Sequence, residues 1–106
     1  MAATKNVLAE GIEIIGTITF QNDMIIDGKV EGEIRSEKGT VTIGENARIK
    51  GDVKTGEVKM FGQVEGAIHA ERCELKANSK LDGDITTASL KMEEGAVLSG
   101  KMQTGG

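Results

Sequence analysis

The sequence predicts an all-β fold in which the chain winds into a β-solenoid of about six coils. The first observation behind this prediction is a five-residue pattern, Φ-x-G-x-Φ with Φ apolar, which occurs six times along the 106 residues. The second is that apolar and polar side chains alternate within each copy, which is the period of a β-strand. One repeat buries too few side chains to offset the entropy of ordering its backbone, so the repeats must stack on one another.

The repeats follow the whole chain in order. The six copies are residues 14–18, 30–34, 49–53, 64–68, 81–85 and 98–102. Their central glycines lie 16, 19, 15, 17 and 17 residues apart, so the length differences fall in the turns. A second element, Φ-x-Φ, precedes most copies as Met24/Ile26, Val41/Ile43, Val58/Met60, Cys73/Leu75 and Leu90/Met92. In the degenerate first coil, Leu8, Ile12 and Ile14 hold the inward places, and Asn6 takes the place of Val41.

The composition is typical of a narrow aliphatic core. Phe20 and Phe61 are the only aromatic residues, Pro is missing and 15 residues are Gly. The net charge of −4 comes from interspersed acidic and basic residues without a basic run, so nucleic acid is not expected as a partner. The single cysteine, Cys73, cannot form an internal disulfide, which indicates a reducing compartment.

The sequence shows no targeting or membrane-spanning segment. No apolar stretch has the length of a signal-peptide core or of a bilayer span. We therefore expect a soluble cytoplasmic protein. Its expected organisation is a short tail over 1–10 that leads into the first coil, a β-helix domain over 11–102 and a second tail over 103–106.

No group of residues predicts catalysis, cofactor binding or metal binding. His69 is the only histidine and falls at an outward position, whereas Cys73 takes an inward place in the core. Asp82 and Asp84 form a pair of carboxylates, but further oxygen ligands for a cation are missing at loop spacing. The glycines recur with the coil, and no phosphate-loop motif is present. We predict a protein that is not an enzyme and that has no cofactor.

Both ends of the predicted solenoid lack a polar cap, which repeat proteins normally need. The inward residues expected at the two ends are Ile12, Ile14 and Ile18 in the first coil, and Leu90, Met92, Leu98 and Met102 in the last. Uncovered strand edges and an exposed apolar interior pair with another chain. We predict that these residues form two polymer interfaces and that the chain assembles with itself into filaments. Tails that fold back as caps, or a dimer, are the alternatives.

The stretch GTITFQNDMIIDGKVEGEIRSEKGTVTIGENARIKGDV and the later glycine-centred copies resemble the bactofilins, which are bacterial polymer-forming cytoskeletal proteins. The resemblance covers about residues 11–102. It implies a single-stranded, right-handed β-helix of triangular cross-section that polymerises end to end, without nucleotide, into apolar filaments. It also implies roles in cell shape, in stalks or appendages, and in placing cell-wall enzymes such as hydrolases, at the inner face of the membrane through partners.

The N-terminal stretch departs from the family pattern, and part of the repeat also fits a second fold. MAATKNVLAE has one Lys and no aromatic residue, so membrane association through the N-terminus is not expected. IGENARI also resembles the hexapeptide repeat of left-handed β-helix acyltransferases, and an enzyme of that type is the alternative function. That class needs strict six-residue periods and a catalytic His, whereas here the coil lengths vary and His69 has no partner. A module that docks a cell-wall hydrolase through charges such as Lys59 or Glu74 is compatible with the filament.

Overall fold

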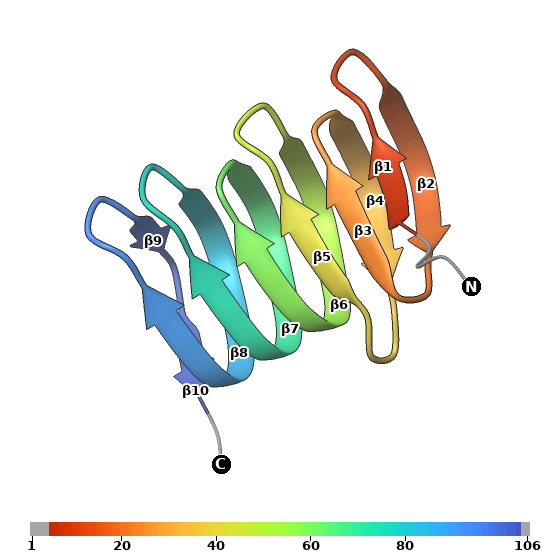
Figure 1. Cartoon of the computed structure of the whole chain (residues 1–106). Helices are drawn as coiled ribbons and strands as arrows, with labels where there is room; N and C mark the ends of the chain where they lie inside the picture. The colour runs from red at the N-terminus through yellow and green to blue at the C-terminus, as the bar shows by residue number, and fades with distance from the viewer. Residues whose placement is uncertain (1–4, 105–106) are drawn as a thin grey trace.

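The computed structural model describes residues 5–104 and shows, within that range, a solenoid of ten strands and no helix. The strands are β1 (Lys5–Leu8), β2 (Glu13–Thr19), β3 (Asp23–Ile26), β4 (Lys29–Arg35), β5 (Thr40–Ile43), β6 (Arg48–Met60), β7 (Gln63–Leu75), β8 (Lys80–Met92), β9 (Val97–Ser99) and β10 (Met102–Thr104). Every pairing between strands is parallel and joins one coil to the next. Figure 1 shows the coils following one another along the rod from β1 to β10.

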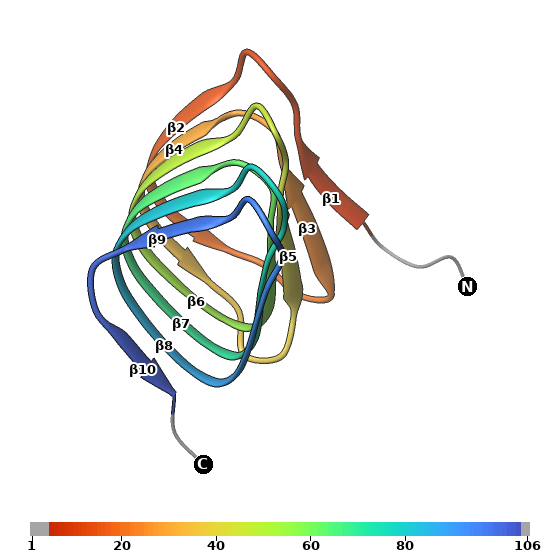
Figure 2. The same cartoon turned by 90° about the vertical axis from the view of Figure 1, so that its left-hand side faces the viewer.

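Each coil contributes one segment to each of three faces, which gives the rod a triangular cross-section (Figure 2). Face 1 consists of residues 13–15, 29–31, 48–50, 63–65, 80–82 and 97–99. Face 2 consists of residues 17–19, 33–35, 52–55, 67–70, 84–87 and 102–104. Face 3 consists of residues 5–8, 23–26, 40–43, 57–60, 72–75 and 89–92. The long strands β6, β7 and β8 run through all three faces.

The solenoid is right-handed. In Figure 2 the C-terminal coil is nearest to the viewer, and the chain turns counter-clockwise from β9 to β10 while it advances toward the viewer. A left-handed winding is therefore excluded for this chain. Hand separates this fold from the left-handed hexapeptide β-helix, although the two share short strands and glycine-rich turns.

Inward side chains stack into four apolar columns that fill the interior. The column of face 1 is Ile14, Val30, Ile49, Val64, Leu81 and Leu98. The column of face 2 is Ile18, Ile34, Val53, Ile68, Ile85 and Met102. The columns of face 3 are Met24, Val41, Val58, Cys73 and Leu90, and beside them Leu8, Ile26, Ile43, Met60, Leu75 and Met92. Members from the middle coils are fully buried, as the alternating pattern predicts.

The corner between faces 1 and 2 is built from the repeated glycines. Gly16, Gly32, Gly51, Gly66, Gly83 and Gly100 stack on one another and have φ between 133° and 141°. Residues with a side chain rarely adopt this conformation. In addition, a Cβ atom at Gly66 would overlap the carbonyl oxygen of Gly51 in the preceding coil. The pattern Φ-x-G-x-Φ is thus two strands on two faces with a glycine corner between them.

Small and hydroxyl side chains fill the other corners. Ala47 and Ser79 are buried between faces 3 and 1, and the Ser79 hydroxyl donates to the carbonyl of Lys76 at 2.6 Å. Thr55 and Thr87 are buried between faces 2 and 3, where each hydroxyl donates to a backbone carbonyl. The described part of the chain therefore buries no side-chain polar atom without a hydrogen-bond partner.

The solenoid extends further toward both termini than the expected range 11–102. β1 lies within the segment that was expected as a tail. Its residues Asn6 and Leu8 align with Met24 and Ile26, so β1 continues the ladder of face 3. At the other end, β10 continues the ladder of face 2 to Thr104. Residues 1–4 and 105–106 of the two expected tails lie outside the described residues.

Candidate functional site

The N-terminal end of the rod is an open sheet edge with an apolar interior. Within the described range, β1 pairs only with β3 and β2 pairs only with β4. Ile14 and Ile18 are the first members of their columns and are only half buried, because no coil covers them on one side. Strand edges and apolar side chains thus reach the surface together at this end.

The C-terminal end has the same construction. β9 and β10 each pair only with β8, and the last segment of β8 pairs only with β7 among residues 5–104. Leu90 and Leu98 are half buried there. Met92 and Met102 end their columns with 45% and 51% of their surface exposed. Each end can therefore bury apolar surface by accepting a further coil.

The residues that the sequence predicted at the two ends lie in the first and last coils of the structure. Ile12 is 45% exposed and lies beside the four columns, at the corner position between faces 3 and 1 that Ala47 and Ser79 occupy in later coils. Two further apolar residues of the first coil are exposed. Val7 and Ile15 point outward, at positions that hold polar residues in most other coils. The sequence analysis missed Val7, which its outward parity could have identified.

The chain as a whole matches a known protein family. The family model described as "Bactofilin: Polymer-forming cytoskeletal" matches residues 6–103, which is nearly the whole chain. The chain belongs to the bactofilin family. The resemblance seen in the sequence is therefore confirmed, and the chain is a cytoskeletal polymer-forming protein rather than an enzyme. The left-handed acyltransferase alternative is not supported.

Curated relatives and solved structures agree with this bactofilin assignment. Bactofilin BacO of Myxococcus xanthus is 31% identical, over 92% of this chain and 78% of BacO. BacP of the same organism is 29% identical, over 95% of this chain but only 42% of BacP. The solid-state NMR structure of the cytoskeletal bactofilin BacA matches with a TM-score of 0.87 at 33% identity, over 96% and 97% of the two chains. The cryo-EM reconstruction of Thermus thermophilus bactofilin double helical filaments matches with a TM-score of 0.89 at 26% identity, over 94% and 99%.

The last coil of this bactofilin is held by an ionic cluster at the corner between faces 3 and 1. The Glu93 carboxylate accepts a hydrogen bond from the Ala77 backbone N–H at 3.0 Å and lies 3.6 Å from the Lys76 ammonium. Lys76 also pairs with Glu74 at 2.9 Å. The hydrogen bond from Lys76 lowers the pKa of the Glu74 carboxyl, and the same bond raises the pKa of Lys76. The cluster ties the C-terminal end to the coil before it.

The single thiol is a core residue. Cys73 is buried in a column of face 3, and burial raises the pKa of its thiol to about 12, with a smaller contribution from the neighbouring Glu74 carboxylate. A thiol reacts as the thiolate, so this position is unsuited to nucleophilic chemistry. The outward-facing His69 is exposed, and the described residues contain no group of three metal-ligating side chains.

We expect Cys73 to be protected from thiol reagents in the native protein. At pH 8, native protein should react with Ellman's reagent at least about 100-fold more slowly than protein in denaturant, because both exposure and the thiolate fraction are lost on folding.

The raised pKa of Cys73 also destabilises the fold at high pH. The free energy of unfolding should be constant below the ordinary thiol pKa of 9.0 and should fall as the pH rises from there toward about 12. Comparison of Cys73→Val with the parent by urea unfolding at pH 8 and 10 checks this. A pH dependence equal in both proteins would contradict it.

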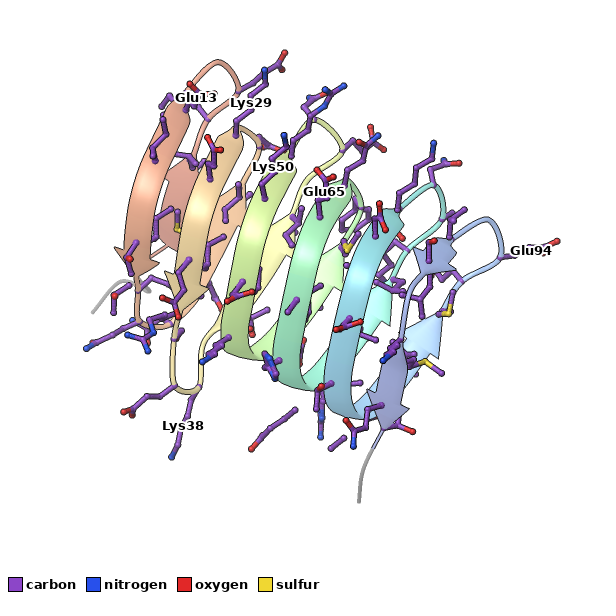
Figure 3. The ribbon with its side chains drawn as sticks, turned by 180° about the vertical axis from the view of Figure 1, so that it is seen from behind. Glu13, Lys29, Lys38, Lys50, Glu65 and Glu94 are labelled. Atoms are coloured by element: carbon purple, nitrogen blue, oxygen red, sulfur yellow. The ribbon has the colours of Figure 1, made fainter. Side chains whose placement is uncertain are left out.

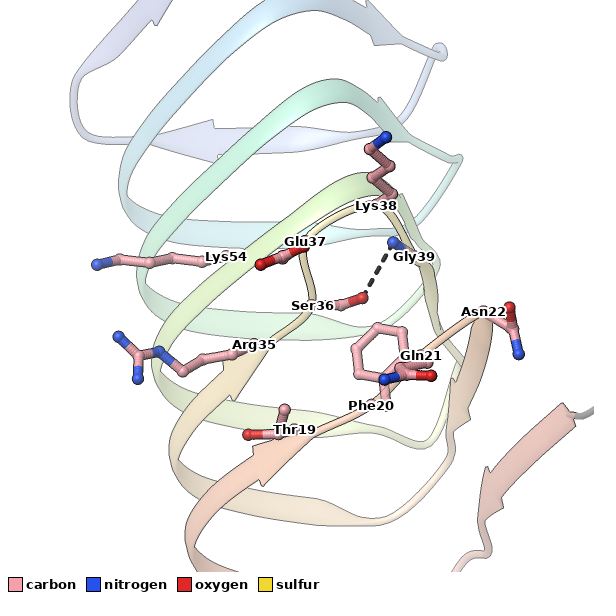
Figure 4. A pocket seen from close by; sticks show the side chains of 10 residues that line it. All are labelled: Thr19, Phe20, Gln21, Asn22, Arg35, Ser36, Glu37, Lys38, Gly39 and Lys54. Atoms are coloured by element: carbon pink, nitrogen blue, oxygen red, sulfur yellow. Dashed lines mark hydrogen bonds between the residues drawn. The ribbon is translucent and has the colours of Figure 1, made fainter.

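The corner between faces 2 and 3 is longer in the first two coils and forms an open groove. The segment 36–39 protrudes there, and Gly39 donates a backbone hydrogen bond to the Ser36 hydroxyl at 3.0 Å (Figure 4). The buried Phe20 ring lies beneath this segment, against Gly39. The groove is lined by Arg35, Lys54 and further polar residues, so it is polar at its mouth and apolar at its floor.

The described residues contain no helix long and apolar enough to cross a bilayer.

Proposed function

We propose that this bactofilin polymerises by joining the open ends of its solenoid, without nucleotide, so that the apolar columns continue from one subunit into the next. The observation that carries this proposal is that the columns of faces 1 and 2 at the N-terminal end, and all four columns at the C-terminal end, finish on side chains that are only half buried or are exposed. Burying a Leu, Ile or Met side chain contributes about 1.5–3 kcal/mol. Several half-exposed side chains at each end therefore supply a substantial driving force, and the open strand edges add directional hydrogen bonds.

The proposed interface residues are those of the terminal coils. They are Ile12, Ile14 and Ile18 at the N-terminal end, and Leu90, Met92, Leu98 and Met102 at the C-terminal end. Ile12 lies beside the columns, at the corner between faces 3 and 1. The stacked columns and strand edges allow either two ends of the same kind to meet, or the N-terminal end of one subunit to meet the C-terminal end of the next.

A scaffold role in the bacterial cytoplasm follows from such a polymer. We propose that the filament supports cell shape or places cell-wall hydrolases and other morphogenesis proteins, at the inner face of the membrane through partners. The described faces offer regular rows of charged side chains for docking, including Lys59 and Glu74 on face 3. Because the related Thermus protein forms double helical filaments, we also propose that two polymers of this chain associate side by side.

The substitution Leu98→Arg tests the junction. It should leave a folded subunit but raise the critical concentration for assembly at least about 100-fold, because an unpaired charge in a dry contact costs about 3–5 kcal/mol. Negative-stain imaging and sedimentation, without nucleotide or metal, measure the outcome, and circular dichroism checks the fold.

The matched control is Ser99→Arg. Ser99 is the next residue of β9 and is exposed on the outer surface, so the same charge there should leave filaments intact. Long filaments in Leu98→Arg, or equal loss in both variants, would contradict the junction.

A further inference from the structure

Face 2 separates its charges into two rows of opposite sign. The row nearer the glycine corner contains Glu33, Asp52 and Asp84 in coils two, three and five, with Ala67 between them. The row two residues further along contains Arg35, Lys54 and His69 in coils two to four. We call these the acidic row and the basic row. The acidic row is followed in the last coil by Lys101, and the basic row by Thr86 and Gln103.

The side chains of both rows are available to a partner. Arg35 Nε donates to Glu33 at 3.1 Å, and this leaves the remaining guanidinium N–H groups at the surface, with 56% of the side chain exposed. Asp52 and Lys54 are exposed and form no ion pair within residues 5–104. Figure 4 shows Arg35 and Lys54 extending side by side in the same direction from neighbouring coils.

We propose that face 2 is the surface through which two copies of this chain pair side by side, with the acidic row of each copy against the basic row of the other. This inference rests on the lateral pairing included in the proposed function and assigns its surface. The geometry follows from symmetry. A two-fold axis parallel to the rod exchanges the two rows across the contact, so Arg35 meets Glu33 of the second copy and Lys54 meets its Asp52, each twice. The paired rods run in the same direction.

The opposite arrangement is disfavoured by the same rows. A two-fold axis perpendicular to the rod and lying in the contact plane would place each row against itself, so Glu33 and Asp52 would meet carboxylates and Arg35 and Lys54 would meet cations. Like charges in direct opposition are destabilising. The charge pattern therefore selects the relative direction of the two rods as well as the face.

Face 1 does not meet this requirement. Its basic positions Lys29, Arg48 and Lys80 stand beside Glu31, Lys50 and Asp82. Figure 3 shows Lys29 and Lys50 on neighbouring coils, and Glu65 on the coil after Lys50. The third coil carries Arg48 and Lys50 together, so in a symmetric pair these two cations would oppose each other at the middle of the contact.

Face 3 is excluded by its order of charges. Glu57 and Lys59 occupy its third coil, but the signs are reversed in the fourth coil, where Arg72 and Glu74 stand. A shift of one coil would bring Glu57 against Glu74. On face 2, a shift of one coil in either direction brings no two like charges together. Two rods that twist around each other can shift lengthwise relative to one another, so their contact must allow a shift of one coil without bringing like charges together.

Each ion pair in this contact is weak, because exposed pairs are screened by solvent. Polymerisation multiplies them, since every subunit along both rods presents the same rows and the later contacts form within one assembly. Lateral pairing should therefore depend on filament length and on salt. Raising NaCl from 50 to 500 mM, where charges are screened within a few ångströms, should convert paired filaments into single ones without dissolving them.

Two charge-reversed proteins test the surface. Arg35→Glu with Lys54→Glu makes both rows of face 2 acidic in coils two and three, and Glu33→Lys with Asp52→Lys makes both rows basic in the same coils. Each alone should form single filaments, because its two rows repel their symmetry mates. When the two proteins are polymerised separately and then mixed, paired filaments should return. The four substitutions together exchange the rows, and this protein should again pair by itself, which shows that the substituted face is still folded.

The matched control is Lys29→Glu with Arg48→Glu on face 1, which changes the net charge by the same amount and should leave pairing intact. Filament width by cryo-electron microscopy is the readout. Paired filaments of the acidic-face protein, equal loss of pairing in the face 1 control, or failure of the mixture to pair would overturn the assignment. Single filaments in the parent protein at low salt would also overturn it while leaving end-to-end polymerisation standing. Loss of all filaments in the parent would instead refute the proposed function.

Discussion

Replacing Gly66 by alanine is expected to unfold this bactofilin or to remove most of its stability. Gly66 lies in the glycine column at the corner between faces 1 and 2, with φ of 137°. Alanine in such a backbone conformation costs about 1–3 kcal/mol. Its methyl group would also overlap the carbonyl oxygen of Gly51, which the ladder of the preceding coil holds in place. The sum should exceed about 4 kcal/mol, a large part of the 5–15 kcal/mol that stabilises a typical domain.

The substitution Gly16→Ala separates the cost of the backbone conformation from the cost of the overlap with the preceding coil. Gly16 has the same φ of 137°, but it lies in the first coil, and a Cβ atom there meets nothing within 4 Å. This variant should lose only the conformational part, about 1–3 kcal/mol. Urea unfolding of both variants in the non-assembling Leu98→Arg protein measures the difference. Equal losses at the two positions would show that stacking of the coils does not require glycine.

Truncation of the face 2 column should affect stability in the middle of the rod and assembly at its end. Ile68 and Ile18 belong to the same column, but Ile68 is fully buried and Ile18 is half exposed in the first coil. Ile68→Ala should destabilise the subunit by about 2–5 kcal/mol, because it leaves a cavity among packed neighbours. Ile18→Ala should cost the isolated subunit about 1 kcal/mol, since its side chain is only partly removed from water.

The order of the two effects should reverse in assembly. If Ile18 becomes buried at a junction, its truncation should raise the critical concentration about tenfold, whereas folded Ile68→Ala subunits should assemble like the parent. Chemical unfolding in the Leu98→Arg protein and sedimentation in the assembling one measure the two quantities. An Ile18→Ala protein that assembles at the parent concentration would place the N-terminal junction elsewhere.

Much of the fold was predictable because the repeat constrains itself. A solenoid stacks equivalent positions, so alternation in any one coil predicts the inward residues of every coil, and Val53 and Ile85 could be placed without coordinates. The roles of Ala47 and Ser79 as small inward residues of the corners followed from the same parity. The recurrence of glycine indicated a corner, although only its φ and the stacked carbonyl show why no other residue fits.

The ends were less predictable, because their positions depend on what no longer repeats. β1 falls within residues 1–10, which were expected as a tail leading into the first coil, although the ladder of face 3 has the predicted alignment of Asn6 with Val41. Ile12 takes the corner position that Ala47 and Ser79 fill in later coils, yet it is 45% exposed. Parity in the sequence assigns a residue to such a position, but the exposed fraction of its side chain depends on the neighbouring coils.

The sequence by itself determined that the chain is a stack of coils with an aliphatic interior, because a pattern of alternating side chains that occurs six times buries its apolar members by stacking the repeats. Only the tertiary structure decided the hand of the winding, the three faces, and which charges become neighbours on each face. Those properties depend on the angle through which the chain turns at each corner, and that angle is set by backbone conformation and by contacts between coils that lie 15 to 19 residues apart in the sequence.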